Sequence, residues 1–473
     1  MKIFRLFLLF FAVKSSAQTG FWSNAGAQVS IIDKAYLSVI GDMYNTNNGT
    51  YYNTDSIFLT RNWNNSAGNI AFINHLDSGY VFLHGADQNI EGLDETFFHN
   101  LSLKNQGIKY GKIDAKVDGI LFLNDRELDM DTQTIWVRNT DVGAVERTQG
   151  FVSSLENGGL LRYTNEASVY KFPVGASRLI ARYRPIELTP QSSAPNQYKV
   201  RFANTDATSE GFDRETRFRL VCEINPNWYH RIFHPQGSDS VDIAIFYDPV
   251  ADNEWDDIAH WQNVPEWQAT FHETKIIQGG FTKITKENWG DFSYPAFALA
   301  ITSEPFALAG VDSIIWKYDT IQFNGSGGVS YTWSPVDELS CSECPDPLAH
   351  PTTSTLYQLI VRDDKGCWDY DSLKIMVRDK PFALFFIPNV ITPNGDGIND
   401  NWFIRDLERY PDNAVKILNR WGDEVFAQQP YGQQWNGTWR NQPLPAGTYY
   451  YLINVKNSSG EEANFDGPLT IIK

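Results

Sequence analysis

Short apolar alternations recur along the first 150 residues, and this recurrence constrains the fold more than any other feature of the sequence. Examples are residues 36–40, 56–59, 80–83, 117–123 and 134–137. Gly, Asn or Asp follows several of them, and the spacing is uneven but mostly about twenty residues, which suits a strand, a polar turn and another strand. The pattern predicts rungs of a β-solenoid over residues 18–150, with an ordinary antiparallel sandwich as the alternative.

The composition indicates an all-β protein with several domains. A chain of 473 residues has room for roughly two to four domains with cores of their own. Aromatic residues make up 14% and hydrophobic residues 42% of it, as in a chain that folds. Asn, Thr, Ser and Gly are common and strong helical patterns are scarce, so we expect short strands joined by turns.

Residues 151–302 are predicted to form a β-sandwich. Residues 198–202, 217–221 and 242–247 alternate as strands do, and turn residues separate them. This part is also rich in tryptophan, at Trp255, Trp261, Trp267 and Trp289. We expect these rings to fill the core and the strand edges. The alternative is an exposed platform on which sugars stack.

The first seventeen residues have the pattern of a secretory signal. Lys2 and Arg5 precede a short apolar run at residues 6–13, and the small residues 15–17 follow. This predicts a signal peptide over residues 1–17 that is cleaved after Ala17, with a buried N-terminal strand as the alternative. The apolar run is too short to span a bilayer. The formal net charge of -18 and the lack of a basic stripe make nucleic acid an unsuitable partner.

Four cysteines are present, and an exported protein meets an oxidising environment in which disulfides persist. Cys341 and Cys344 are close enough in sequence for a local bridge. No second pair of ligands follows at the spacing of a zinc site. Cys222 and Cys367 belong to different predicted domains, so the sequence leaves open whether either remains a free thiol.

Residues 305–379 contain several short strands with turn signals, which predict an immunoglobulin-like sandwich. The stretches 309–312, 325–335, 357–361 and 364–367 resemble the PKD-like repeats of bacterial surface proteins. Many such repeats have a cysteine near the position of Trp316 that is able to pair with the one at Cys367. Since tryptophan stands there in this chain, the resemblance does not supply the usual bridge.

Residues 381–473 contain several separate motifs. Apolar residues flank a polar turn and predict a hairpin over residues 415–426. Asn436-Gly437 indicates another tight turn. Tyr449, Tyr451, Ile453 and Val455 alternate and can bury one face of a strand. We expect a small antiparallel, Ig-like sandwich.

The motifs at residues 387–400, 415–426, 435–439 and 444–451 resemble, in this order, the type B C-terminal sorting domain of the Bacteroidota type IX secretion system. This family is also called the gliding-motility-associated C-terminal domain. The resemblance covers residues 381–473 and implies export to the cell surface, on the extracellular face of the outer membrane, or release. It also implies two partners, the type IX translocon and an outer-membrane barrel of the PorP/SprF kind.

The loop at residues 394–400 gathers oxygen ligands around flexible glycines. Asn394, Asp396, Asn399 and Asp400 are residues of the kind that bind Ca²⁺. The loop lacks the longer ligand set and the terminal Glu of an EF-hand. Because Asn, Asp and Gly also favour turns for backbone reasons alone, calcium and a purely structural turn both remain open, and no other cofactor is predicted.

Five places read Asp, then Ser or Thr, then an aliphatic residue. This pattern resembles the O-glycosylation acceptor of Bacteroidota, with chance occurrence at strand starts as the alternative. The candidate acceptors are Ser56, Ser240, Ser313, Thr320 and Ser372.

No catalytic motif is evident in the sequence. No nucleophile elbow, HExxH motif or phosphate loop occurs. His230 and His234 are four apart but lie among strand-like residues, and Asp256 and Asp257 are expected in an exposed stretch. We therefore expect a non-enzymatic, adhesin-like surface protein that contacts glycans or other cell surfaces. A secreted polysaccharide-active enzyme with the same sorting domain is the alternative.

Overall fold

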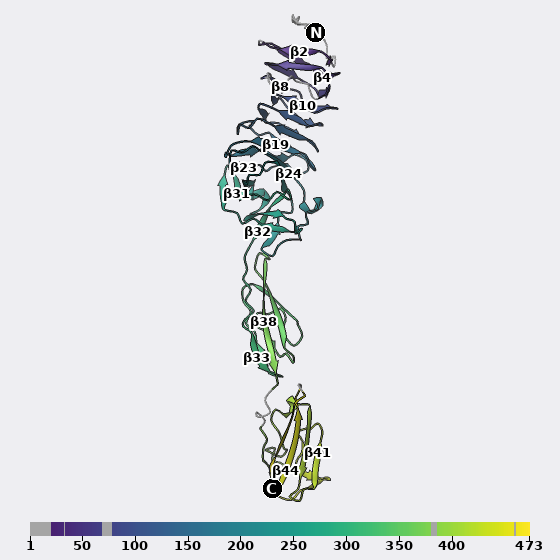
Figure 1. Ribbon diagram of the computed structural model, residues 1–473, viewed down its shortest axis with the longest axis vertical. Helices are drawn as coiled ribbons and strands as arrows, with labels where there is room; N and C mark the ends of the chain where they lie inside the picture. The colour runs from purple at the N-terminus through teal and green to yellow at the C-terminus, as the bar shows by residue number, and fades with distance from the viewer. Residues whose placement is uncertain (1–19, 33, 69–77, 380–385, 458–459) are drawn as a thin grey trace. The chain divides into compact units, whose positions relative to one another are not determined.

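The computed structural model describes residues 20–32, 34–68, 78–379, 386–457 and 460–473 (Figure 1). The predicted signal peptide at residues 1–17 lies outside these residues. The chain divides into two compact units, Met1–Glu304 with Lys365–Cys367, and Pro305–Asp364 with Trp368–Lys473. The fold is nearly all β, as the composition predicted. No helix among the described residues has the length and apolar character needed to cross a membrane.

The first unit begins with a β-solenoid of about six turns, so the predicted rungs are confirmed. One sheet takes a strand from each successive rung, in the order β1 (Gly20–Ala25), β4 (Gly41–Thr46), β7 (Trp63–Ser66), β9 (Gln88–Gly92), β12 (Lys109–Gly111), β15 (Glu127–Asp129) and β18 (Phe151–Ser153). A second sheet is formed by β3 (Tyr36–Val39), β6 (Ser56–Leu59), β8 (Tyr80–Leu83), β11 (Asn100–Leu103), β14 (Leu121–Asn124) and β17 (Val145–Arg147). Neighbouring strands in both sheets are parallel.

Two further sets of parallel strands complete the rungs. The first rungs pair β2 (Gln28–Ile31) with β5 (Thr50–Asn53). Later rungs contribute β10 (Thr96–Phe98), β13 (Ala115–Val117), β16 (Thr134–Val137) and β19 (Gly159–Thr164). Figure 1 shows these strands stacked as successive layers.

Alternate side chains of each rung point inward and pack against the rungs above and below. Leu101 and Leu121 are in register on β11 and β14, and both are fully buried. Burying a leucine completely is worth about 1.5–3 kcal/mol. Because an inward residue repeats on every rung, the core continues along the solenoid.

Asparagine also occupies the interior of the first three rungs. Asn24, Asn45 and Asn65 are in register on β1, β4 and β7 and are almost completely buried. The Asn45 side-chain amide donates to the Gly49 carbonyl (2.8 Å) and to the Asn65 side-chain oxygen (3.4 Å). These bonds supply partners for polar groups that would otherwise be costly to bury.

The parallel solenoid passes into an antiparallel sandwich at β19. This strand is parallel to β16 on one side and antiparallel to β24 on the other. The same sheet continues through β24 (Asn196–Ala203), β26 (Tyr229–Gln236), β32 (Ala296–Thr302), β28 (Asp257–Trp261) and β29 (Trp267–Ala269), and β25 (Val221–Ile224) also pairs with β32. Solenoid and sandwich therefore share one sheet, and their buried residues form one hydrophobic cluster from Ile31 to Leu299.

A second, antiparallel sheet completes the sandwich. Its order is β20 (Tyr170–Phe172), β23 (Ile186–Pro190), β27 (Val241–Tyr247), β31 (Phe281–Trp289) and β30 (Thr274–Gln278). The short elements are the hairpin β21 (Gly175–Ala176) with β22 (Arg182–Tyr183), the 3-10 helix η1 (Ala207–Glu210) and the helix α1 (Pro249–Asp252). The strand predicted over residues 217–221 is wrong, because residues 219–220 form a turn and β25 starts only at Val221.

Tryptophan fills the interior of the sandwich, as the sequence predicted. Trp255, Trp261 and Trp267 are buried, and Trp289 is partly buried. Trp261 and Trp267 pack edge-on, with ring centroids 5.6 Å apart. The alternative of an exposed sugar-stacking row at these positions is wrong for the three buried rings.

The second unit begins with a small all-β module. Its main sheet has the order β33 (Ser313–Trp316), β38 (Trp368–Arg378), β37 (Thr355–Arg362) and β35 (Ser330–Ser334), and β34 (Ile321–Gln322) pairs with β36 (Leu348–Ala349). Trp333 and Tyr357 are fully buried in its core and pack against Phe323. The resemblance of this module to PKD-like repeats stays a prediction.

Candidate functional site: the C-terminal domain

The last domain is built on one five-stranded sheet. Its order is β39 (Val390–Ile391), β45 (Glu462–Ile471), β44 (Gly447–Lys456), β40 (Asp412–Leu418) and β41 (Glu424–Gln428). The short elements are η3 (Leu407–Arg409) and the hairpin β42 (Thr438–Trp439) with β43 (Gln442–Pro443). The hairpin predicted over residues 415–426 is confirmed as β40 and β41. The turn of the β42–β43 hairpin, however, is at Arg440 and Asn441, both with positive φ, and not at Asn436-Gly437.

One face of this sheet is buried. Tyr449, Ile453 and Val455 of β44 are inside and Tyr451 is partly buried, so the predicted alternation is confirmed. Trp402 is fully buried against them and donates from Nε1 to the Pro388 carbonyl (2.7 Å). Because the segment before β39 is hydrogen-bonded to the core in this way, the loop that follows has a fixed base.

The loop at residues 394–400 is held by its own hydrogen bonds. The Asp400 carboxylate accepts from the backbone amides of Asn394 (2.9 Å), Gly395 (2.7 Å) and Gly397 (2.7 Å). The Asp396 carboxylate accepts from the Ile398 amide (2.8 Å) and from the Asn394 side chain (3.0 Å). These bonds use oxygen atoms that a cation would need as ligands.

The amides of Gly395 and Gly397 hold the pKa of Asp400 below its usual range, since an N–H donor favours the charged carboxylate. Asn399 has positive φ (54°), as Asn in turns often does. This geometry agrees with the alternative that residues 394–400 form a purely structural turn. Calcium binding stays an open alternative, which the calorimetric experiment in the Discussion tests.

The domain as a whole is a small sandwich whose sheet, core and loop are formed from the motifs that carry the sorting-domain resemblance. The family model of the CHU_C type IX secretion signal domain matches residues 385–471. The predicted C-terminal sorting domain is therefore confirmed, and this part of the chain is a type IX secretion signal domain. Such a signal implies contact with the type IX secretion machinery, secretion, and attachment at the cell surface.

No curated protein matches the sequence of this chain. Two solved structures are similar over part of their length, the dimeric latent PorU of Porphyromonas gingivalis and the human desmocollin-1 ectodomain. The first is 8% identical with a TM-score of 0.14, and the match covers 61% of this chain and 31% of PorU. The second is 9% identical with a TM-score of 0.16 and covers 61% of this chain and 64% of desmocollin-1. This chain thus spans less than two thirds of either protein, and similarity at these scores says nothing about its function.

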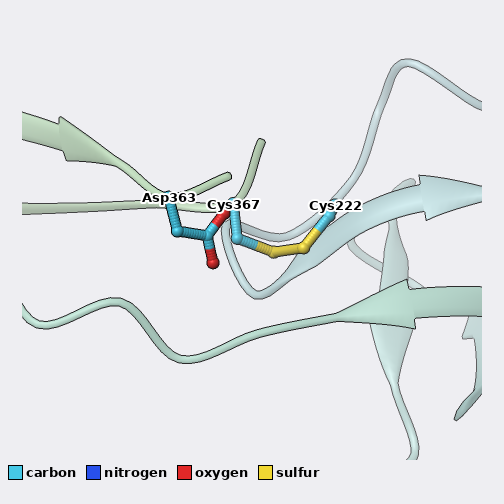
Figure 2. Close-up of side chains that lie close together, drawn as sticks. All are labelled: Cys222, Asp363 and Cys367. Carbon is cyan, nitrogen blue, oxygen red and sulfur yellow. A yellow bond between two sulfur atoms is a disulfide. The ribbon is translucent and has the colours of Figure 1, made fainter. Parts of the chain in front are cut away.

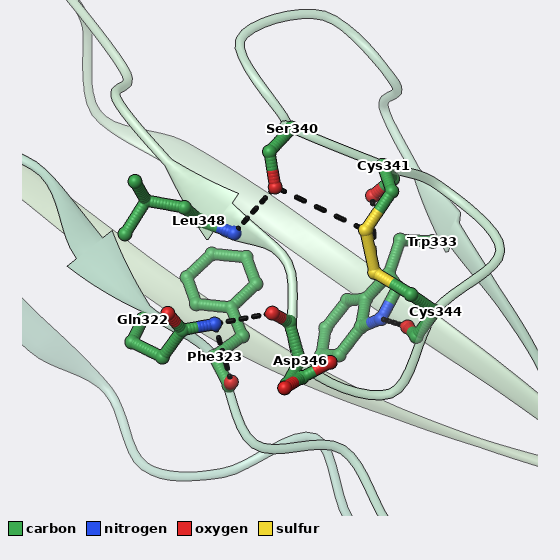
Figure 3. The surroundings of a disulfide bond; sticks show 8 residues. All are labelled: Gln322, Phe323, Trp333, Ser340, Cys341, Cys344, Asp346 and Leu348. Atoms are coloured by element: carbon green, nitrogen blue, oxygen red, sulfur yellow. Dashed lines mark hydrogen bonds between the residues drawn. A yellow bond between two sulfur atoms is a disulfide. The ribbon is translucent and has the colours of Figure 1, made fainter.

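Cys341 and Cys344 are joined by a disulfide (Figure 3). The loop that holds them lies over the buried ring of Trp333, whose Nε1 donates to the Cys344 carbonyl (3.0 Å). The hydroxyl of Ser340 accepts from the Leu348 amide (2.8 Å). The bridge therefore closes a loop that is also hydrogen-bonded to the core of its module.

Cys222 and Cys367, whose status the sequence left open, form a second disulfide (Figure 2). Cys222 is on β25, and Cys367 comes immediately before β38. Residues 365–367 group with the first unit, and Lys365 there forms an ion pair with Asp256 (3.0 Å). Sequence spacing could not reveal this bond because the two positions are 145 residues apart.

The candidate glycosylation residues differ in exposure. Thr320 and Ser372 are exposed, whereas Ser56, Ser240 and Ser313 are half-buried. The Ser240 hydroxyl donates to the Asn288 side chain (2.5 Å), and the Ser313 hydroxyl donates to the Val311 carbonyl (3.2 Å). Thr320 and Ser372 are consequently the most accessible of the five for a modifying enzyme.

The two polar pairs considered for chemistry, His230 with His234 and Asp256 with Asp257, are hydrogen-bonded to neighbouring parts of the fold. His230 is fully buried and hydrogen-bonded through Nε2 to the Arg184 carbonyl (2.8 Å), and His234 contacts the Asn196 side chain (3.0 Å). The expectation that Asp257 is exposed is wrong, because its side chain is buried. Its carboxylate accepts hydrogen bonds from the backbone amides of Phe271 (3.1 Å) and His272 (2.9 Å). These bonds hold the segment between β29 and β30 against β28.

Sequence reasoning missed a cluster of aromatic side chains on the outer face of the solenoid. The rings of Phe58 and Phe82 stack with centroids 4.7 Å apart, and Tyr80 stacks on Phe82 at 5.7 Å. Tyr36 lies edge-on to Phe58 (6.3 Å), and Phe122 lies 6.0 Å from Tyr80. The alternation of residues 56–59 and 80–83 carries the signal, since every second position of these strands faces outward and three of these positions, Phe58, Tyr80 and Phe82, are aromatic.

Proposed function

We propose that this chain is an adhesin-like surface protein whose solenoid and sandwich are displayed outside the cell. The sorting domain provides the route of export. We further propose that the chain is exported with the help of an outer-membrane barrel of the PorP/SprF kind. Its destination is then the extracellular face of the outer membrane, and cleavage of the predicted signal peptide precedes this step.

The observation that carries the proposal is the outer aromatic cluster of the solenoid, formed by Tyr36, Phe58, Tyr80, Phe82 and Phe122. Tyr36 is 58% exposed and Tyr80 is 37% exposed, and the three Phe rings are half-buried beside them. Tyrosine supplies a large rigid contact area with a hydroxyl at its end, which suits binding to glycans or to proteins of another surface. Contiguous exposed apolar patches of this kind mark interaction sites.

We propose a binding role rather than a catalytic one. The adjacent carboxylates Asp256 and Asp257 were the acidic pair considered for hydrolysis. Asp256 accepts from the Thr302 amide (2.8 Å) and pairs with Lys365, while Asp257 is used by the backbone amides described above. Carboxylates engaged in this way support a structural role for this pair.

The test is a binding screen with the full chain against a glycan array and whole cells, together with the double variant Tyr36→Ser/Tyr80→Ser. We expect the wild-type chain to bind, and the variant to lose about tenfold or more in affinity, as hot-spot residues do. A matched control is Tyr44→Ser, a half-buried tyrosine of the neighbouring sheet. Equal binding by the double variant and the wild type would contradict the proposal, and release of sugars from a polysaccharide would favour the enzyme alternative.

A further inference from the structure

The hairpin between β40 and β41 ends in an exposed tryptophan. Trp421 is 73% exposed, compared with 44% for Trp439 on the β42–β43 hairpin. Leaving an indole in water forfeits the free energy that its burial would supply. The Trp421 ring lies outside the buried core of the domain, whereas Trp402 and Trp435 are part of it.

The turn that presents Trp421 is fixed by one asparagine. The side-chain oxygen of Asn419 accepts from the backbone amides of Trp421 (2.9 Å) and Asp423 (3.0 Å), and its amide donates to the Asp423 carboxylate (3.0 Å). Two backbone bonds, from Asn419 to Asp423 (2.9 Å) and from Gly422 to Asn419 (3.0 Å), close the turn. A partner that binds this turn pays little conformational entropy, because the turn is already ordered.

Arg420 lies over the indole of Trp421, with its guanidinium carbon 4.2 Å from the ring centroid. Within the described part of the chain, no carboxylate forms an ion pair with Arg420. The tip therefore offers a flat apolar surface and a positive charge side by side. Tryptophan and arginine are also the residues most enriched among interface hot spots.

We propose that this tip, defined as residues 419–423, is the contact through which the sorting domain binds a protein of the type IX machinery. The partner surface would hold an apolar groove that accepts the indole and a carboxylate that faces Arg420. This inference rests on the export function of the domain. A folded protein fits better than an anionic membrane, because the tip itself contains Asp423, Glu424 follows it, and the chain has a net charge of -18.

The experiment expresses the full chain in a Bacteroidota host with a working type IX system and measures its amounts in the periplasm and outside the cell. The variants are Trp421→Ala, Arg420→Ala and a deletion of residues 386–473. Trp439→Ala is the matched control, because Trp439 is also exposed and also stacked on an arginine, Arg440 (4.7 Å). We expect Trp421→Ala to lower the exported amount about tenfold or more, Arg420→Ala to lower it several-fold, and Trp439→Ala to match the wild type.

The outcomes separate this inference from the export function itself. Normal export of the deletion variant would contradict the export function. A block of the deletion variant with normal export of Trp421→Ala, or equal losses in Trp421→Ala and Trp439→Ala, would overturn the role of the tip. Binding of the purified chain to phosphatidylglycerol vesicles that is lost in Trp421→Ala would also overturn it, in favour of a membrane contact.

A thermal melt of each purified full-length variant checks folding. Since the Trp421 side chain is largely exposed, we expect Trp421→Ala to melt as the wild type does. If Trp421→Ala melts at a lower temperature than the wild type, the export of Arg420→Glu is the test instead. This substitution leaves the indole and the Asn419 bonds in place. Export of a stably folded Arg420→Glu variant at the wild-type level would then overturn the proposal.

Discussion

Cys222 on β25 is covalently bonded to Cys367, which follows it by 145 positions in the sequence. Both cysteines belong to the first unit, because residues 365–367 group with it. In the chain-entropy model a disulfide stabilises the folded state by restricting the unfolded chain, and a loop of this length is worth about 5 kcal/mol. The double variant Cys222→Ser/Cys367→Ser should therefore unfold at a clearly lower denaturant concentration, as followed by tryptophan fluorescence.

The control for this prediction is Cys341→Ser/Cys344→Ser, which removes a bridge of sequence separation 3. The same model gives such a short loop only about 2 kcal/mol. The first double variant should thus lose more stability than the second. Equal losses, or a larger loss in the second variant, would show that loop entropy does not govern these two bridges.

The strands of the solenoid were predictable because their signal is local. Every second residue of a strand such as residues 56–59 faces the core, so apolar alternation with polar turns is visible in the sequence itself. The C-terminal domain was predictable for the same reason, since its hairpin and its buried face follow from alternation between residues 415 and 455.

Contacts between distant residues could not be predicted in this way. The bond between Cys222 and Cys367 depends on where two segments meet in space, and four cysteines permit three pairings. Asp257 was expected to be exposed because its neighbours in sequence are polar. The backbone amides that receive its carboxylate belong to residues 271–272, and nothing in the sequence around Asp257 indicates them.

His230 predicts a loss of stability in acid. Complete burial lowers the pKa of this histidine from 6.5 to about 4, because the interior disfavours the charged imidazole. Between these values the unfolded chain binds a proton that the folded chain does not, so stability is full above pH 6.5 and is lost as the pH falls towards 4. The total loss is about 3 kcal/mol, at about 1.4 kcal/mol per pH unit.

Urea denaturation of the full chain at several pH values between 7 and 4, with tryptophan fluorescence as the signal, measures this slope. The variant His230→Gln should show a flatter dependence, since glutamine does not titrate. His99→Gln is the control, because the His99 side chain is only half-buried on the solenoid. An unchanged slope in His230→Gln would assign the acid sensitivity to other groups.

The asparagines inside the first rungs predict a polar contribution to the stability of the solenoid. Asn45→Leu keeps the branching and the number of side-chain heavy atoms but removes the donor to the Gly49 carbonyl and to Asn65. Leaving these buried acceptors without that donor should cost about 1–3 kcal/mol. Asn64→Leu is the matched control, since Asn64 alternates with the inward-facing residues of β7 and is only half-buried. Denaturant unfolding should separate the two variants, and a larger loss in Asn64→Leu would contradict this account.

Asp400 predicts how the loop at residues 394–400 responds to pH. Its pKa is lowered by the amides of Gly395 and Gly397, so the carboxylate stabilises the loop at neutral pH. A carboxyl group with a lowered folded pKa loses this contribution as the pH falls through the folded value. Asp400→Asn should therefore melt below the wild type at pH 7, and this difference should shrink as the pH falls below the ordinary carboxyl pKa of 3.8, as measured by calorimetry of the full chain. Asp412→Asn, an exposed carboxylate of the same domain, is the control and should melt as the wild type does at pH 7.

The same loop also predicts the outcome of a calcium titration. Because Asp400 and Asp396 already accept five hydrogen bonds from the loop, a cation would have to displace several of them to reach its usual six to eight oxygen ligands. We therefore expect isothermal calorimetry with millimolar Ca²⁺ to give no heat that differs between the wild type and Asp400→Asn. A binding heat that is present in the wild type and absent from Asp400→Asn would instead establish the loop as a calcium site and show that its hydrogen bonds rearrange around the ion.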